Sequence, residues 1–155
     1  MADNLIHSLQ LKFASLPSWA NKPADLWFGD VWATRANGSR TNYPLFAFTH
    51  TGTQQQSTFN HTAIELWSWR FSTYEQSPQA AQAVYRGVLY AGGTPEQKLG
   101  FWYPDTLEMP TGYRFLHLKP TGPFRIEPLG DQFGPTGAPI VRLAWDMELM
   151  VQQVA

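Results

Sequence analysis

Residues Pro139–Val151, PIVRLAWDMELMV, alternate between apolar and polar side chains and decide the fold class of this chain. From position 141 onward the odd-numbered residues are all apolar, whereas the even-numbered ones include Arg142, Asp146 and Glu148. Successive side chains of a strand point to opposite faces, so this pattern predicts a long strand with one buried and one solvated face. A helix, with its period of 3.6, would scatter the same apolar residues around its circumference. The rest of the chain must therefore cover the apolar face.

Further strands are predicted upstream. In the stretch Thr62–Thr73 (TAIELWSWRFST), Trp67, Trp69 and Phe71 share one face while Ile64 and Leu66 lie on the other. Apolar residues on both faces favour a central strand that is covered by helices on one side and partly by protein on the other. The remaining predicted strands are Leu26–Thr34, Tyr43–His50, Gly112–Lys119 and Phe124–Pro128, the last two joined as a hairpin by the turn at 120–123.

Two helices are predicted. The first spans about Asn4–Leu16, where Leu5, Leu9, Phe13 and Leu16 form an apolar stripe at spacings of three and four. The second spans about 78–91, because Ser77-Pro78 combines an N-cap with a first-turn proline. Gly92-Gly93 is expected to end it in the left-handed conformation. Its small residues, Ala80, Ala83 and Gly87, are expected to let it lie close to the sheet.

These elements predict an α+β fold, with a mostly antiparallel sheet packed by the N-terminal helix and the central helix. The sequence has no internal repeat, charge block or low-complexity linker, so residues 1–155 are expected to form a single domain.

Composition excludes several classes of protein. Of the 155 residues, 43% are hydrophobic and only 15% are charged, which is typical of a folded globular chain. A formal net charge of −1 lacks the basic excess expected of a nucleic-acid-binding protein. The absence of cysteine excludes disulfides, thiolate metal sites and cysteine nucleophiles, and it fits folding in a reducing cytoplasm. Neither a signal peptide nor a membrane-spanning segment is expected.

No catalytic, cofactor or metal site is expected. His50 and His61 flank the polar segment Thr51–Asn60, but a metal site there would need a third ligand at a suitable spacing. No serine lies in a Gly-x-Ser-x-Gly elbow. The loop Leu129–Ala138 contains GDQFGPTG, which has glycines but neither the lysine nor the following helix of a phosphate-binding loop.

Charged residues of the predicted strands admit two interpretations. Asp146 and Glu148 would suit a hydrolase only if a cleft faced them. Opposite charges displayed on one sheet face can instead pair within the subunit or across an interface, and pairing within the subunit is favoured. The basic residues concerned are Arg70, Arg114, Arg125 and Arg142, and the acidic ones are Glu65, Glu127, Asp146 and Glu148.

The order of elements resembles that of the tail-terminator and tail-completion proteins of long-tailed bacteriophages. The resemblance is carried by Thr62–Gly93, a strand that leads through a short polar turn into a helix, and by the closing strand VRLAWDMELMVQ. The chain departs from the family pattern at Leu26–Trp32, Thr51–Asn60 and Phe101–Asp105.

The resemblance implies a non-enzymatic structural protein of the virion tail and neck, assembled in the host cytoplasm. Six copies would form a ring that caps the tail tube protein and joins it to the head–neck connector or head-closure protein. DNA would pass through the ring without sequence-specific recognition. We expect the contacts between subunits or with the tube in the segments Thr51–Asn60 and Leu129–Ala138. The candidate contact residues are Thr51, Gln54, Gln55, Gln56, Phe59, Asp131, Gln132 and Phe133.

Two alternatives remain open at this point. Another neck or tail-tube protein, such as a head-closure protein, would share the same general role. A carbohydrate-binding module would instead stack sugars on Trp67, Trp69 or Trp102, and it predicts exposed coplanar rings on a monomer.

Overall fold

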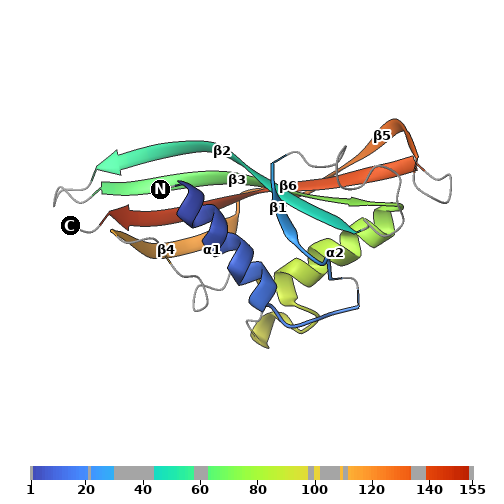
Figure 1. Cartoon of the computed structure of the whole chain (residues 1–155), viewed down its shortest axis with the longest axis horizontal. Coiled ribbons are helices and arrows are strands. Elements are labelled where there is room, and N and C mark those ends of the chain that lie inside the picture. The colour runs from blue at the N-terminus through green and yellow to red at the C-terminus, as the bar shows by residue number, and fades with distance from the viewer. Residues whose placement is uncertain are drawn as a thin grey trace.

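Strand β6 (Pro139–Gln153) lies near the middle of the sheet and pairs with three other strands. The computed structural model describes residues 2–20, 22–29, 44–57, 63–97, 100–101, 109, 112–133 and 139–153. Over these residues the chain has the predicted α+β fold, with two α-helices and a six-stranded, mostly antiparallel sheet (Figure 1). The other elements are α1 (Ala2–Ser15), β1 (Leu26–Phe28), β2 (Leu45–Ser57), β3 (Ala63–Glu75), α2 (Pro78–Tyr90), the 3₁₀ helix η3 (Pro95–Gln97), β4 (Tyr113–Pro120) and β5 (Arg125–Phe133).

The sheet has the strand order β1-β2-β3-β6-β4, with β5 also paired to β6. Every pairing is antiparallel except that of the short strand β1, which runs parallel to β2. Strands β4 and β5 lie end to end along the same edge of β6, β4 beside residues 147–153 and β5 mainly beside residues 141–144. The predicted central position of β3 is confirmed, since it lies between β2 and β6.

The predicted hairpin between the strands now labelled β4 and β5 is wrong. Neither strand pairs with the other, and β5 instead forms a hairpin with β6, ending at the pair Phe133 and Pro139. The turn after β4 is held against β6, because the backbone N–H of Thr121 donates to the carbonyl oxygen of Asp146 over 3.0 Å. A strand as long as β6 offers enough edge for both neighbours. Residues 129–133, expected in a loop, therefore continue β5.

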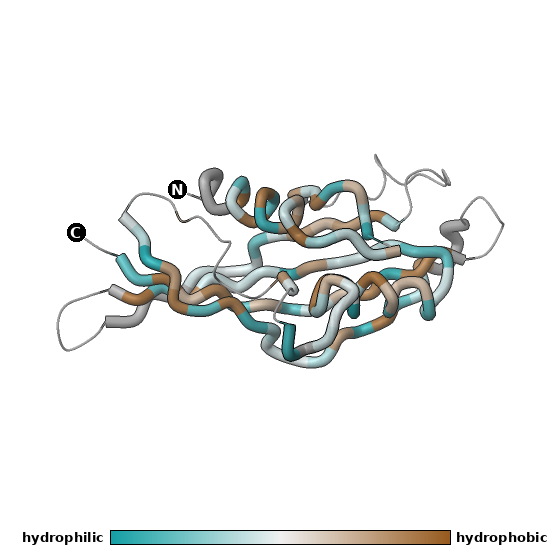
Figure 2. The backbone as a smooth tube through the Cα atoms, turned by 90° about the horizontal axis from the view of Figure 1, so that it is seen from below, coloured by the Kyte–Doolittle hydropathy of each residue, from teal (hydrophilic) through white to brown (hydrophobic). Residues whose placement is uncertain are grey.

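One face of the sheet, here called the inner face, packs against both helices. The predicted stripe of α1 is confirmed by the burial of Leu9, Phe13 and Leu16. Figure 2 shows hydrophobic and hydrophilic stretches alternating along this helix, next to the N label. The apolar stripe of α2 is also buried, and it consists of Ala81, Val84, Val88 and the C-cap residue Ala91. In β6 every odd-numbered residue from 141 to 151 is buried, as the alternating pattern predicts. Trp145 lies at the centre, with ring centroids 5.6 Å from Phe46 and 5.7 Å from Phe71.

Helix α2 begins and ends close to its predicted positions. The Ser77 hydroxyl accepts a hydrogen bond from the backbone N–H of Ala80 over 3.1 Å, and Pro78 occupies the first turn. The left-handed conformation begins one residue earlier than expected, at Ala91 with φ of 50°, and continues at Gly92 with φ of 78°.

Two β-bulges change which residues share a face. In β4 the bulge between Phe115 and His117 adds a residue, so Phe115 and Leu118 both point to the inner face. A strict period of two would place His117 on the same face as Phe115, but that period does not continue across a bulge. In β2 a bulge lies between His50 and Gly52.

The polar segment Thr51–Asn60 is largely strand rather than hairpin tip. Strand β2 continues to Ser57, and its residues 52–57 pair with residues 63–68 in the first half of β3. Residues 58–62 lie outside the described residues. Pairing with β3 satisfies the backbone hydrogen-bonding groups of this segment. A polar segment without alternating apolar residues gives no sequence pattern that would predict such a strand.

Within the described part of the chain, neither helix combines the length and apolar character that crossing a lipid bilayer requires.

Candidate functional site

Charged side chains gather on the face of the sheet opposite the helices, here called the outer face. Arg70 of β3 donates from Nε to Asp146 of β6 over 3.1 Å, and Arg125 of β5 lies 3.7 Å from the same carboxylate. Arg142 of β6 pairs with Glu127 of β5 at 2.6 Å. The expected pairing within the subunit is thus confirmed for these residues.

The His117 imidazole makes a further contact on this face. Its Nε2 lies 3.4 Å from Oε1 of Glu148. The bulge in β4 places the two side chains on the same face, because it moves His117 away from the core.

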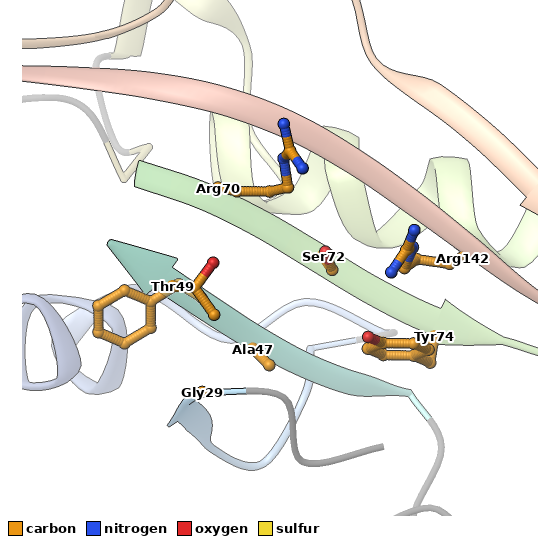
Figure 3. Close-up of a pocket in the computed structure, with 8 residues that line it drawn as sticks. Gly29, Ala47, Thr49, Arg70, Ser72, Tyr74 and Arg142 are labelled. Atoms are coloured by element: carbon orange, nitrogen blue, oxygen red, sulfur yellow. The ribbon is translucent and has the colours of Figure 1, made fainter. Parts of the chain in front are cut away.

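A pocket of ≈ 190 Å³ opens on the outer face beside these ion pairs (Figure 3). Strands β2, β3 and β6 supply most of its lining, and Gly29 closes one side. Its described lining residues include two arginines and three hydroxyl groups but no carboxylate. They are Gly29, Ala47, Phe48, Thr49, Arg70, Ser72, Tyr74 and Arg142. We call this site the arginine pocket.

Arg142 is fixed in place by its neighbours. Partial burial would lower the pKa of its guanidinium, but hydrogen bonds with Glu127 and Tyr74 and the charge of Glu127 outweigh burial and raise the pKa above its ordinary value. Arg142 therefore carries a full positive charge throughout the accessible pH range. Figure 3 shows its guanidinium extending from β6 toward Ser72 and Tyr74 of β3.

The sheet also leaves two backbone edges open at one end. Strand β1 pairs only with Phe46, Ala47 and Phe48, so residues 49–57 of β2 have no strand beyond them among the described residues. Strand β4 pairs with β6 on one side and with no described strand on the other. Unpaired strand edges are sites at which another chain can add a strand.

The candidate contact residues fall at two separate places. Thr51 lies at the exposed bulge of β2, and the backbones of residues 54–56 form part of its open edge. Residues Asp131, Gln132 and Phe133 end β5, whose last pair is with Pro139 at the start of β6. Residues 54–56 pair with residues 64–66 of β3, and on their other side these β3 residues pair with residues 150–152 of β6. The two predicted segments therefore lie near opposite ends of β6, and Phe59 lies outside the described residues.

The histidines do not assemble a metal site in the described structure. No group of three potential ligands occurs among the described residues, which do not include His61. His50 instead lies against two tryptophans, with ring centroids 5.2 Å from Trp67 and 4.9 Å from Trp69. Its Nε2 lies 2.8 Å from the Thr53 hydroxyl.

The two tryptophans expected to bind sugars are not exposed. Trp67 and Trp69 are stacked with an interplanar angle of 15°, but they are only 4% and 0% exposed. They belong to the core on the inner face, because the odd positions of β3 point toward the helices. A sugar-stacking platform on these two rings is therefore excluded, and Trp102 lies outside the described residues.

The acidic pair expected of a hydrolase is already engaged by basic groups. Asp146 contacts two arginines and Glu148 contacts His117. Neither acid lines the arginine pocket. This geometry gives no support to a catalytic role for the two carboxylates.

Sequence reasoning missed Thr49, Ser72 and Tyr74 as potential binding residues. The signal was weak but present, because Arg70, Ser72 and Tyr74 follow one another at every second position. That spacing places them on one face of a strand.

No protein-family model matches the chain, and no curated protein is significantly similar to it. Its function must therefore be argued from its own residues and geometry.

Proposed function

We propose that this chain is a structural subunit of a long-tailed bacteriophage, a tail terminator that forms a ring on the end of the tail tube. The ring would join the tube to the head–neck connector, and the subunit would have no catalytic role. The observation that carries the proposal is the pair of open strand edges, β2 on one side of the sheet and β4 on the other. The α+β fold, and the strand β3 followed by helix α2, agree with the sequence resemblance.

The directions of the two edges suit repeated addition of identical subunits. From β2 through β3 and β6 to β4, each pairing is antiparallel, so β2 and β4 run in opposite directions. When β4 of one copy is placed beside β2 of the next, the new pairing is also antiparallel. Each subunit then offers a different surface to each neighbour, which is the heterologous contact from which rings are built.

Lengths and positions of the edges are compatible with such a joint. The open part of β2 covers residues 49–57, and β4 covers Tyr113–Pro120. Both edges lie at the same end of the sheet, because residues 50–56 of β2 are aligned through β3 with residues 147–152 of β6, and β4 pairs with residues 147–153. Figure 1 shows these four strands extending together beyond α1 and α2. The number six for the ring comes from the family resemblance, as do the tail tube and the connector as partners.

The first experiment is to measure the native mass of the purified protein, alone and after mixing with tail tubes. Mass photometry is expected to show a discrete ring, either free or only on the ends of tubes. A protein that stays monomeric and ignores the tubes would contradict the proposal. Localisation of the subunit to the tail end of assembled virions, by labelling, would be the matching structural result.

Two proline variants test the edge contact itself. The carbonyl oxygen of Phe48 accepts from the backbone N–H of Gly29, the residue that follows β1, so the backbone groups of Phe48 face the edge of β2 that is open further along the strand. The β3 partners of Phe48 and Gln55 are Phe71 and Glu65, an even number of residues apart, so the backbone of Gln55 faces the same way. Gln55→Pro removes an edge N–H, whereas Gln54→Pro removes one directed at β3.

We expect Gln55→Pro to keep a near-normal melting temperature while losing the ring. Gln54→Pro is expected to lower the melting temperature, because it breaks the ladder between β2 and β3. If Gln55→Pro folds normally and still assembles on tubes, the edge does not form the subunit contact.

A further inference from the structure

We propose that the arginine pocket on the outer face binds a phosphate group. The inference goes beyond the proposed structural function and does not depend on it, because the pocket is complete within one subunit. It rests on Arg70 and Arg142, on the hydroxyl groups of Thr49 and Ser72, and on the lack of a carboxylate among the described lining residues.

The charges around the pocket favour an anion. Asp146 is shared by Arg70 and Arg125, so this trio keeps one positive charge in excess. Arg142 is neutralised by Glu127 but its guanidinium still forms one wall of the pocket. Each acid holds its arginine in an ion pair, and neither acid is among the described lining residues of the pocket. Such preorganisation lowers the entropic cost of binding.

The strand register extends this preference over the whole outer face. The strand register places five basic and three acidic described residues on the outer face. This face therefore carries a surplus of positive charge, although the net charge of the whole chain is −1. The basic residues are Arg70, Arg114, Lys119, Arg125 and Arg142, and the acidic residues are Glu127, Asp146 and Glu148. Clustered positive charge of this kind attracts phosphate groups.

The remaining donors suit a tetrahedral group better than a planar carboxylate. A carboxylate is best recognised by the two parallel N–H groups of one guanidinium. Here each arginine already bonds to a carboxylate of the protein. Thr49 and Ser72 add hydroxyl groups from β2 and β3, and neither hydroxyl group has a side-chain hydrogen bond among the described residues. Donors that arrive from three strands can serve oxygens that point in several directions.

The dimensions of the pocket agree with this ligand. Its ≈ 190 Å³ exceeds several-fold the roughly 30 Å³ that one water molecule occupies in the liquid. Figure 3 shows Ser72 next to Arg70 along β3, with the guanidinium of Arg142 extending toward it from β6. A phosphate group at Ser72 would lie in the same pocket as both arginines.

Two arginine variants provide a matched test. Arg70 and Arg125 both contact Asp146 and are similarly exposed, at 47% and 45%, but only Arg70 lines the pocket. Inorganic phosphate is titrated into the full-length protein at constant ionic strength, with binding followed by calorimetry. We expect Arg70→Gln to weaken binding by about tenfold, and Arg125→Gln by less than about twofold. Because Asp146 keeps one arginine in each variant, both should fold, and their melting temperatures check this.

Further titrations identify the chemistry and its source. Ser72→Ala is expected to weaken phosphate binding by several-fold, since a hydrogen bond to a charged group is lost. Acetate is expected to bind more weakly than phosphate. A short DNA duplex that binds with the same dependence on Arg70 would make the phosphate that of a nucleic-acid backbone. A duplex that fails to compete with inorganic phosphate would make it a free phosphate or a small phosphoester.

Two results would overturn the proposal. Equal losses in Arg70→Gln and Arg125→Gln would show a general effect of surface charge rather than a pocket. Acetate binding as tightly as phosphate would show that the site does not select a tetrahedral anion.

Discussion

The indole of Trp19 lies directly against Gly87 of helix α2, at a place where any side chain on Gly87 would collide with it. A Cβ atom built on Gly87 would overlap Nε1 and Cε2 of the indole and lie 2.7 Å from Cδ1. Trp19 belongs to the loop after α1, and its ring also contacts Phe13 with centroids 6.4 Å apart. Because Gly87 has no side chain, the loop between α1 and β1 can pack directly against helix α2 through Trp19.

Gly87→Ala is expected to destabilise the protein although alanine favours helices. The gain in helix propensity is about 1 kcal/mol. Overpacking against the partly buried indole costs about 1–3 kcal/mol, so the net change should be a loss. Chemical denaturation of the variant measures it.

The control is the double-mutant cycle with Trp19→Ala. When the indole is absent, Gly87→Ala should become neutral or stabilising, because only the propensity remains. An equal loss of unfolding free energy in both backgrounds would mean that Trp19 is not the obstacle.

The contact of Gly87 with Trp19 shows what the sequence left undetermined. The sequence predicted α2 well, because its cap, first-turn proline and apolar stripe are all local signals. It also predicted that Gly87 permits a close approach, but assigned the approach to the sheet. The partner is a loop residue, and loop positions follow from tertiary packing that no periodicity records.

The same distinction explains the strands. The alternation in β6 and the burial of Trp67 and Trp69 in β3 are properties of single strands, and the patterns of both predicted strands are confirmed in the structure. Pairing partners are not local, so the sequence joined β4 to β5 where the structure joins each to β6. The bulge before His117 was likewise invisible, because it appears only as a mismatch between two paired strands.

The arginine pocket was only partly predictable for a similar reason. The sequence placed Arg70 and Arg142 in strands and favoured ion pairs within the subunit, which the structure confirms. Their convergence with Thr49 depends on the register of three strands. Register is set by side-chain packing across the sheet rather than by any one segment.

Trp145 is expected to be the most sensitive apolar residue of β6. It is fully buried among Phe46, Phe71 and Tyr85, with ring centroids 4.8–5.7 Å away. Trp145→Ala should cost about 3–5 kcal/mol of unfolding free energy, because it removes a large ring and leaves a cavity.

Met150→Ala is the matched control for this variant. Met150 lies on the outer face of the same strand and is only partly buried. Its loss should cost less than about 1.5 kcal/mol, measured by the same denaturation experiment. Similar costs for the two variants would contradict the assignment of inner and outer faces.

The ionisation of Glu75 should by itself make the folded protein less stable at neutral pH than at acidic pH. Burial raises the pKa of its carboxyl above the ordinary value, and the hydrogen bond from the backbone N–H of Gln76, 2.9 Å long, only partly offsets this. The folded state therefore binds the proton more tightly than the unfolded state. The resulting penalty is fully present above the folded-state pKa and disappears as the pH falls below the unfolded-state pKa.

Glu75→Gln removes that penalty while keeping an oxygen that can accept from Gln76. The variant should be more stable than the parent at pH 7.5, by less than about 1 kcal/mol because solvent partly screens the site. The difference should shrink toward zero at pH 3.5, where the parent carboxyl is protonated in the folded state and largely so in the unfolded state. Urea denaturation at both pH values measures the two differences, and the exposed Glu96→Gln controls for the loss of one negative charge. A gain that is the same at both pH values would have to come from packing rather than from the proton, and the assignment of the raised pKa to burial of Glu75 would then be wrong.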